Sequence, residues 1–561
     1  MALRTRAARG YAVLDCVSMV GVACAREARL LECVRWAAMS CAALAFGLFV
    51  FAKAKMRLLP SSPQFVTTTW RYGQRLSRTV SQQPPTSPDT ESSATDEIVA
   101  QGWLSSSSWI LATALVPGVD GVRVSIGNKI CYILPDDLIV AHAYESAVPL
   151  GSTGLGFGTD PAAIVQLAAG ALGVPLDRAR LDAKWERIRV RRRPGPALAT
   201  QREEIEQFSQ NAAAYLARNV LSDGRFRYEV DAISGAERGV YEFARHAGAT
   251  YYLALSYKRS KRGEFGVALS QATRALLSAV EHCGPYACIV REGQLEFGGT
   301  ALGLLALVQA IEADVPNVSP ELPSVAKSLS EFLRSQQKSD GEFQHDFDMK
   351  RTAPVDRQYP FYSGEAVLAL ARYGRFARDA ASLDAASRGL RYLVTRGWNF
   401  FGNRYFYGAE HWTCQAVAEL WQHQPDCDAL QFCLRWSEQG DLLQQQGSDA
   451  AFDVDGNYGV GPVFEPQLIA VGGRVEGVVG TFEAARQAGV NPFTLARLRS
   501  QIERALRLVA RHQLGREHAH LLNSPYWLGG VPTSPVNLSV RIDGPQHAGA
   551  AAIRYLDATS R

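Results

Sequence analysis

Two kinds of helix alternate along the chain from residue 201 onward, and they differ in how apolar residues are spread around them. One kind has small or apolar residues on nearly every side, as in residues 298–307 (GGTALGLLAL). The other kind has one apolar stripe, as in residues 324–337, where Val325, Leu329, Phe332 and Leu333 mark a single helix face. Similar stripes run through residues 201–218, 268–282, 381–395 and 493–513. This alternation predicts an inner ring of helices covered on both sides and an outer ring that meets water.

The helices that are apolar all round recur six times, about every 45 to 70 residues, each after a loop rich in glycine and aromatic residues. Each begins with a characteristic pair of residues: Arg245 and His246, Gly298 and Gly299, Gly364 and Glu365, Glu410 and His411, Val475 and Glu476, Gln546 and His547. The intervals leave room for a second helix in every repeat. Six such helical pairs predict a closed toroid.

The run at residues 333–343 (LRSQQKSDGEF), followed by the small-residue helix from Gly364, resembles the repeats of six-hairpin (α/α)6 toroids. That group includes six-hairpin glycosidases, N-acylglucosamine 2-epimerase-like sugar isomerases and terpenoid cyclase relatives. The resemblance covers about residues 201 to 558 and implies a mainly α fold, but these families share the barrel and differ in chemistry. Two departures stand out: Asp453 and Asp455 do not form the DxDD acid of squalene cyclases, and no Cys/His zinc set is present.

The N-terminal third predicts three further regions. Residues 36–52 carry no charge and lie between Arg35 and Lys53, so residues 1–57 are interpreted as a retained membrane anchor, with a cleaved signal segment or a buried helix as alternatives. Residues 58–98 are rich in Pro, Ser and Thr and predict a disordered linker. Residues 99–196 predict a small α+β domain, with strands at 109–115, 122–127, 129–135 and 185–193, and residues 197–561 are expected to form the toroid.

Composition narrows the partners and the chemistry. Lys and Arg total 59 against 55 for Asp and Glu, without a basic stripe, so nucleic acid is not expected as a partner. The ten cysteines follow neither a zinc pattern nor a dense disulfide framework. Cys283 and Cys288 could be bridged in an oxidising compartment or be two free core thiols. The glycine-rich residues 151–160 lack a Walker lysine and are interpreted as a surface loop.

Polar residues at the starts of the inner helices should converge on one rim of the toroid, although they lie far apart in sequence. The candidates for proton transfer are Glu365, Glu410 and Glu476, with His246, His411 and His547 as partners. The candidates for substrate binding are Arg245, Asp346, Arg357, Tyr359, Trp412, Arg541 and Asp543, and Asp348 lies in the same loops. Arginines among them suit an acidic group such as a uronate.

Purely structural roles are the alternative for each of these residues. A glutamate in the first turn of a helix is favoured by the helix dipole, and Arg245 could pair with one of the carboxylates. His518 and His520 could bind a metal, but an i, i+2 pair after an outer helix is more typical of a surface. No metal site and no cofactor is predicted.

The resulting functional hypothesis is a membrane-anchored enzyme that acts on a saccharide or glycoconjugate by acid–base chemistry, as a hydrolase, lyase or epimerase. Aromatic residues in the rim loops, Trp412 among them, suit the flat faces of sugar rings. Export of the folded domains to the periplasm or the cell exterior is expected if the chain begins in the cytosol. The alternatives are a non-catalytic binding or assembly scaffold of the cell envelope, and a terpenoid cyclase-like enzyme.

Overall fold

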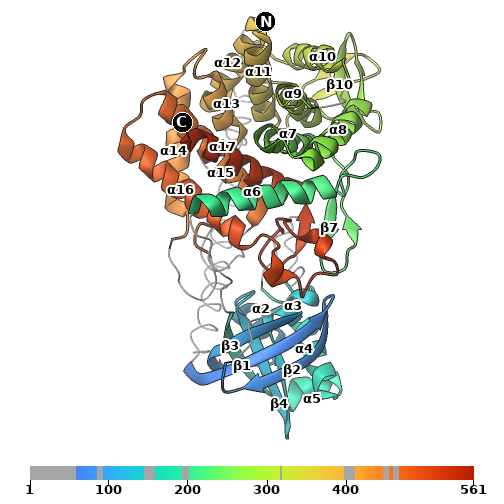
Figure 1. Cartoon of the computed structure of the whole chain (residues 1–561), viewed down its shortest axis with the longest axis vertical. Coiled ribbons are helices and arrows are strands. Elements are labelled where there is room, and N and C mark those ends of the chain that lie inside the picture. Colours follow the sequence, from blue (N-terminus) through green and yellow to red (C-terminus); the bar gives the residue numbers. More distant parts are fainter. Residues whose placement is uncertain are drawn as a thin grey trace, which may run out of the picture.

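The chain folds into a helical ring and a smaller sheet domain, which lie at opposite ends of the molecule (Figure 1). The computed structural model describes residues 59–84, 92–144, 158–192, 201–315, 319–396, 411–446, 454–458 and 467–560. Residues 36–52, the predicted membrane segment, lie outside these ranges. Among the described residues, no helix combines the length and the apolar character that a membrane crossing needs.

The ring has an inner and an outer layer of helices, as the alternating pattern predicts. The inner helices are α7 (Phe243–Ser260), α9 (Phe297–Glu312), α11 (Tyr362–Ala377), α13 (Trp412–Leu420), α15 (Leu468–Gln487) and α17 (Asp543–Thr559). The outer helices are α6 (Gln201–Arg218), α8 (Gly263–Ser278), α10 (Leu322–Ser335), α12 (Ala380–Thr395), α14 (Cys427–Leu443) and α16 (Pro492–Arg511). Each inner helix packs against the next, and α17 closes the ring by packing against α7. The predicted (α/α)6 toroid is confirmed.

Burial explains the two layers. In α9 every residue from Phe297 to Ala310 is buried, because neighbours cover this helix on all sides. In α10 the buried side chains include Leu329, Phe332 and Leu333, which lie on one face, while the opposite face meets water.

Short strands organise the loops that lead into the inner helices. β7 (Glu229–Asp231), β8 (Glu237–Arg238) and β14 (Ser539–Arg541) form one sheet beside the starts of α7 and α17. β9 (Val280–Cys283), β10 (Tyr286–Arg291) and β11 (Gln294–Leu295) precede α9, and the hairpin of β12 (Asp346–Asp348) and β13 (Ala353–Val355) precedes α11. These loops therefore have a backbone scaffold of their own.

The smaller domain is a six-stranded antiparallel sheet with the order β2-β1-β3-β6-β4-β5. Its strands are β1 (Leu59–Arg71), β2 (Gln74–Ser81), β3 (Ser93–Trp103), β4 (Asp120–Ile126), β5 (Lys129–Ile133) and β6 (Lys184–Arg192). Its helices are α2 (Ser108–Ala114), α3 (Pro135–Val140), α4 (Pro161–Leu172) and α5 (Leu176–Leu181). The domain has the α+β character predicted from the sequence, and β4, β5 and β6 lie where strands were predicted.

Two predictions for this region are wrong. The supposed linker at residues 58–98 contains β1, β2 and the start of β3, because Val66, Thr68 and Trp70 alternate as buried residues in a β-branched and aromatic segment. The Pro- and Ser-rich composition concealed this alternation. The strand predicted at residues 109–115 is wrong as well: residues 108–114 form helix α2, because a short apolar run is ambiguous between the two structures.

Two disulfides link neighbouring segments of the toroid, and a buried contact between a histidine and an aspartate links the toroid to the sheet domain. Cys283 is bridged to Cys288, and Cys414 on α13 is bridged to Cys433 on α14, with Cα separations of 5.8 and 5.6 Å. The first bridge resolves an open alternative, and the second was not predicted. His520 is not a surface residue: its Nε2 lies 2.7 Å from Asp136 of the sheet domain, and both side chains are buried.

Candidate active site

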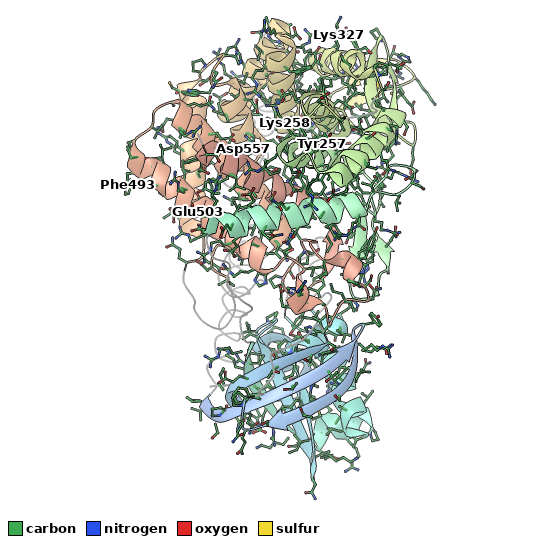
Figure 2. All side chains as sticks on the ribbon, in the orientation of Figure 1. Tyr257, Lys258, Lys327, Phe493, Glu503 and Asp557 are labelled. Atoms are coloured by element: carbon green, nitrogen blue, oxygen red, sulfur yellow. A yellow bond between two sulfur atoms is a disulfide. The ribbon has the colours of Figure 1, made fainter. Side chains whose placement is uncertain are left out.

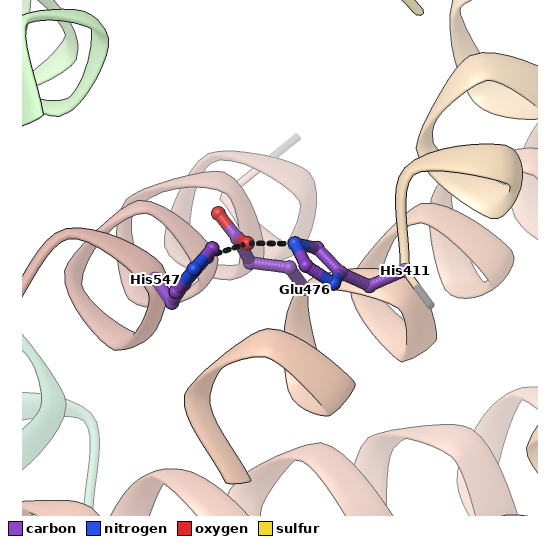
Figure 3. Close-up of side chains that lie close together, drawn as sticks. All are labelled: His411, Glu476 and His547. Atoms are coloured by element: carbon purple, nitrogen blue, oxygen red, sulfur yellow. Dashed lines mark hydrogen bonds and ion pairs between the residues drawn. The ribbon is translucent and has the colours of Figure 1, made fainter. Parts of the chain in front are cut away.

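Three side chains from three inner helices form a buried cluster, His411, Glu476 and His547 (Figure 3). Glu476 Oε2 lies 2.7 Å from His547 Nδ1 and 3.2 Å from His411 Nε2. The imidazole rings are 4.8 Å apart and nearly perpendicular. All three residues were predicted as site candidates, and the fold brings them together although His411 and His547 lie 136 positions apart in sequence.

Glycines on α15 make room for the cluster. A Cβ atom at Gly473 would lie 3.3 Å from His411 Nδ1, and one at Gly472 would lie 3.0 Å from the backbone nitrogen of Ala548, the neighbour of His547. At Gly477 the added atom would be 2.8 Å from the ring of Trp436. The glycine-rich sequence VGGRVEGVVG therefore lets α13 and α17 approach α15 closely on either side of Glu476.

The Glu476 carboxyl is ionised in this setting. Burial alone would raise its pKa, but the charge of His547 and the contacts with both histidines outweigh burial and lower the pKa. Its second oxygen, Oε1, is buried and has no hydrogen-bond partner among the described residues. The three side chains also place their ligand atoms within 4.8 Å of one another, which is close enough to hold a metal ion.

The arginines expected to bind an acidic substrate are paired within the protein. Arg541 holds Asp543 through two bonds of 2.8 Å, and Arg245 Nε lies 2.8 Å from the same carboxylate. Burial would raise the pKa of Asp543, but these two guanidinium groups lower it to about 2. Arg245 also pairs with Glu242 and donates to the Tyr228 hydroxyl. This is the structural role that the sequence left open for Arg245.

Carboxylates gather where α11 begins. Glu365 is buried, and its Oε2 would lie 2.7 Å from a Cβ atom at Gly298, so the glycine at the start of α9 makes space for it. Burial, and next the charges of Glu365 and Glu296, raise the pKa of Tyr362. The residue before this helix, Phe361, has a φ of 75°, which is strained for a side chain with a Cβ atom.

Glu296 was missed by the sequence analysis. It precedes α9, its Oε2 accepts the backbone N–H of Phe243 at 2.8 Å, and it pairs with Arg291. Burial raises its pKa. Its position directly before the predicted Gly298 and Gly299 pair was the available signal, but the pattern placed the helix start at the glycines.

The loop before α11 contains a more exposed group of predicted residues. Arg357 pairs with Asp346 at 2.9 Å and donates to Tyr359 at 3.3 Å, and Asp348 lies on the same hairpin. Beneath them is His345, which the sequence analysis missed. Its Nδ1 accepts the Tyr359 N–H at 2.8 Å, so its Nε2 carries the hydrogen toward Ser363, and burial lowers its pKa to about 3.

His246 does not join the cluster, and Glu410 lies outside the described residues. The His246 ring is fully buried between α7 and α8. Its Nδ1 lies 2.6 Å from the Tyr241 hydroxyl, and its Nε2 lies 2.8 Å from the Ala272 carbonyl oxygen. Burial lowers its pKa to about 4. Trp412 does lie at the cluster, with its ring centre 4.2 Å from that of His411 and 5.9 Å from that of His547.

The chain matches no protein-family model and no curated protein sequence. It resembles solved structures, among them a D-mannose isomerase, with 11% identity over 65% of this chain and 100% of that one at a TM-score of 0.48. A cellobiose 2-epimerase from Bacillus thermoamylovorans is 12% identical over 63% of this chain and 98% of that one, at a TM-score of 0.47. An α-1,6-mannanase from Salegentibacter sp. is 10% identical over 64% of this chain and 100% of that one, at a TM-score of 0.45. These proteins are (α/α)6 toroids. At such identities and TM-scores no residue role is transferred, and the closed ring establishes the toroid independently.

Proposed function

We propose that the chain is an enzyme that acts on a saccharide by proton transfer, with His411, Glu476 and His547 as its acid–base centre. The observation that carries this proposal is that one ionised, buried carboxylate oxygen contacts two imidazoles on opposite sides. Such a set can hold one histidine protonated while the other is neutral. One ring then acts as an acid and the other as a base.

The charges explain why the two rings differ. A single carboxylate stabilises one imidazolium, whereas two imidazolium rings 4.8 Å apart would repel each other. In a neutral ring, the nitrogen that faces Glu476 carries the hydrogen, because a carboxylate only accepts. The other nitrogen then has a lone pair that can take a proton from a substrate. This favours a reaction in which a proton leaves one position and returns at another, as in epimerisation or isomerisation.

The residues around this centre support a saccharide as the substrate. Trp412 gives an apolar face beside both histidines, and Glu365 and Glu296 lie at the neighbouring inner helix starts. Aromatic faces with hydrogen-bonding neighbours suit the two sides of a pyranose ring. The D-mannose isomerase and the cellobiose 2-epimerase rearrange sugars according to their names, so aldoses and disaccharides are the first substrates to assay.

The test is deuterium incorporation into these sugars in D₂O, followed by mass spectrometry, with the full chain and with single variants. Glu476→Gln, His411→Gln and His547→Gln should each lower turnover by about 100-fold or more. The exposed His423→Gln is the matched control and should keep full activity. Wild-type levels of turnover in the Glu476→Gln variant would exclude this centre.

Two outcomes would favour the other functions. Loss of glycoside hydrolysis in Glu365→Gln, with full activity in both histidine variants, would favour a hydrolase that works through carboxylates. Binding of a sugar without turnover or deuterium exchange would favour a binding scaffold. The export of the folded domains and their tethering through residues 36–52 also remain proposals, and two disulfides suit an oxidising compartment.

A further inference from the structure

A cavity of 460 Å³ opens at the mouth of the toroid where the inner helices end, opposite the histidine cluster. All six inner helices contribute to its wall near their C-termini, for example through Tyr251 on α7, Gln309 on α9, Arg372 on α11, Glu419 on α13 and Arg554 on α17. The sequence analysis expected a polar pocket at the other mouth and assigned nothing to this one. Its volume is within the range of small-molecule sites.

The charges of the wall are unequal. Six cationic side chains line the cavity: Lys258, Arg259, Arg372, Arg375, Arg486 and Arg554. The anionic side chains are four: Glu312, Glu419, Glu483 and Asp557. Lys258 and Asp557 can be located in Figure 2, near the ends of α7 and α17. The wall therefore has two more cationic than anionic side chains, and Glu206, outside the wall, also pairs with Arg259 at 3.2 Å.

An ion network fills the deeper part of the cavity. Arg372 reaches Glu312 at 2.6 Å and Glu419 at 3.2 Å, and so joins α9, α11 and α13. Arg554 pairs with Glu483, which joins α17 to α15. Every carboxylate of this network accepts from at least one guanidinium group, so the acceptors are occupied.

Three buried hydrogen-bond donors beside this network, in contrast, have no acceptor among the described residues. Gln309 Nε2, Arg372 Nε and Gln415 Nε2 are buried and have no hydrogen-bond partner among the described residues. The orientation of both amides follows from their neighbours: Gln309 Oε1 accepts from Arg372 at 2.8 Å, and Gln415 Oε1 accepts from Arg554. Since guanidinium groups only donate, the amide nitrogens must be the atoms without partners. Buried donors without acceptors are costly in a site that only stabilises the fold.

We propose that this mouth binds a small anion with several oxygens, a phosphate or a carboxylate carried on a polar metabolite. Its oxygens would accept from Gln309 and Arg372. Its negative charge would be attracted by the cations of the wall, of which Arg486 donates to the Ala558 carbonyl and pairs with no carboxylate among the described residues. The site is independent of the acid–base centre, because it lies at the opposite mouth. The inference therefore stands or falls separately from the proposed reaction.

The experiment is isothermal titration calorimetry of the full chain with inorganic phosphate, citrate and glucose 6-phosphate at constant ionic strength, with glucose as the neutral probe. The double variant Lys258→Gln/Arg375→Gln removes two charges at the mouth while Arg372 still holds Glu312 and Glu419. Lys327→Gln, on the outer helix α10, is the matched control (Figure 2). At least one anion should bind the wild type and the control, glucose should not bind, and the double variant should weaken anion binding about tenfold or more.

A second measurement needs no variant. Hydrogen–deuterium exchange in the last turns of α7, α9 and α11 should slow when the bound anion is present, and exchange near the histidine cluster should stay unchanged. Binding of phosphate and glucose 6-phosphate without citrate identifies the ligand as a phosphate, and the reverse identifies a carboxylate. Absence of binding by all three anions, equal affinity in the double variant and the Lys327→Gln control, or protection confined to other helices would overturn the proposal.

Discussion

Asp543 shows how a buried carboxylate at the start of α17 is kept ionised by its neighbours. Two arginines from different segments hold it, Arg541 from β14 and Arg245 from α7. The carboxylate thus ties the two ends of the ring together, because α7 and α17 are the helices that close it. Its interactions lower its pKa from 3.8 to about 2, which makes the charge a source of folding stability.

We expect Asp543→Asn to lower the free energy of unfolding at pH 7 by about 2 kcal/mol or more. The folded pKa lies below the unfolded one, so the wild-type contribution is complete above about pH 4 and is lost as the pH falls toward 2. Urea denaturation at pH 7 and at pH 3 measures both effects. Asp223 forms an exposed ion pair with Arg225, so Asp223→Asn should lower the free energy of unfolding by well under 1 kcal/mol. Equal losses of stability in both variants would contradict the argument.

Two buried histidines also make the chain less stable as the pH falls, but in a higher pH range than Asp543. Burial lowers the pKa of His345 to about 3 and that of His246 to about 4, whereas an unfolded histidine titrates near 6.5. The unfolded chain therefore takes up protons that the folded chain does not. Stability from these residues is complete above pH 6.5 and is lost as the pH falls toward 4.

This predicts that the chain loses stability between pH 6.5 and pH 4, with a smaller loss in the His345→Gln variant. Glutamine at this position can still donate to Ser363, but it does not titrate. The melting temperature measured at half-unit steps of pH gives the slope for each protein. A wild-type slope of zero, or an unchanged slope in the variant, would exclude this cause.

At the scale of elements, helix contacts in the ring depend on residues without side chains. Gly549 on α17 faces Tyr252 on α7, and a Cβ atom there would lie 2.1 Å from the tyrosine ring. The ring cannot move easily, because the Tyr252 hydroxyl donates to the Ser209 carbonyl of α6 at 2.5 Å and is fully buried. Gly549 therefore sets the distance between the helices that close the ring.

Gly549→Ala should destabilise the toroid by about 1 to 3 kcal/mol through overpacking, although alanine is the better helix former. Gly170→Ala on α4 is the matched control, since nothing lies within 4 Å of the added atom, and it should be neutral or stabilising. Thermal unfolding of both variants compares the two effects. Stabilisation by Gly549→Ala would show that α7 and α17 are less tightly packed than described.

The sequence predicted the elements of the ring better than their exact beginnings. Alternating burial identified the inner helices, because that pattern depends only on which faces are covered. The start of α15 was placed at the pair Val475 and Glu476, but the helix begins at Leu468, because the glycines of its first turns resemble a loop. That displacement puts Glu476 in the middle of the helix, where it can reach both histidines.

The sequence placed His411, Glu476 and His547 at one rim, but it also placed His246 there, which packs between α7 and α8 instead. The positions of His411, Glu476 and His547 followed from the repeat, whereas the pairing of Arg245 and Arg541 with Asp543 depends on how neighbouring helices are turned. His345 gave no signal, because a single buried polar residue looks like any surface residue in sequence, and Glu296 was missed because the start of its helix was placed at the glycines that follow it. The cavity at the far mouth could not be predicted, since its wall combines the ends of six helices.

At the scale of the molecule, a buried hydrogen bond between a histidine and an aspartate joins the sheet domain to the toroid. Asp136 at the start of α3 and His520, after the last outer helix, lie 2.7 Å apart and are both almost fully buried. The ring of Trp70 on β1 lies 6.0 Å from that of His520, and the backbone of Gly73 donates to the His520 carbonyl. One histidine therefore connects the toroid to β1, to the turn after it and to α3.

We expect His520→Ala to loosen the sheet domain without unfolding the ring, because it leaves the Asp136 carboxylate buried without this partner and removes the contact with Trp70. Hydrogen–deuterium exchange should then quicken in β1 and α3, while α9 and α11 keep their protection. His518→Ala is the matched control: it lies two residues away, and its nearest acidic partner, Glu517, belongs to the same loop. Unchanged exchange in His520→Ala would mean that other contacts hold the two domains together, such as the Gly73 backbone bond and the approach of His142 to Asp231. Faster exchange across the ring as well would mean that the sheet domain is part of one cooperative unit, and that the histidine cluster depends on it for its stability.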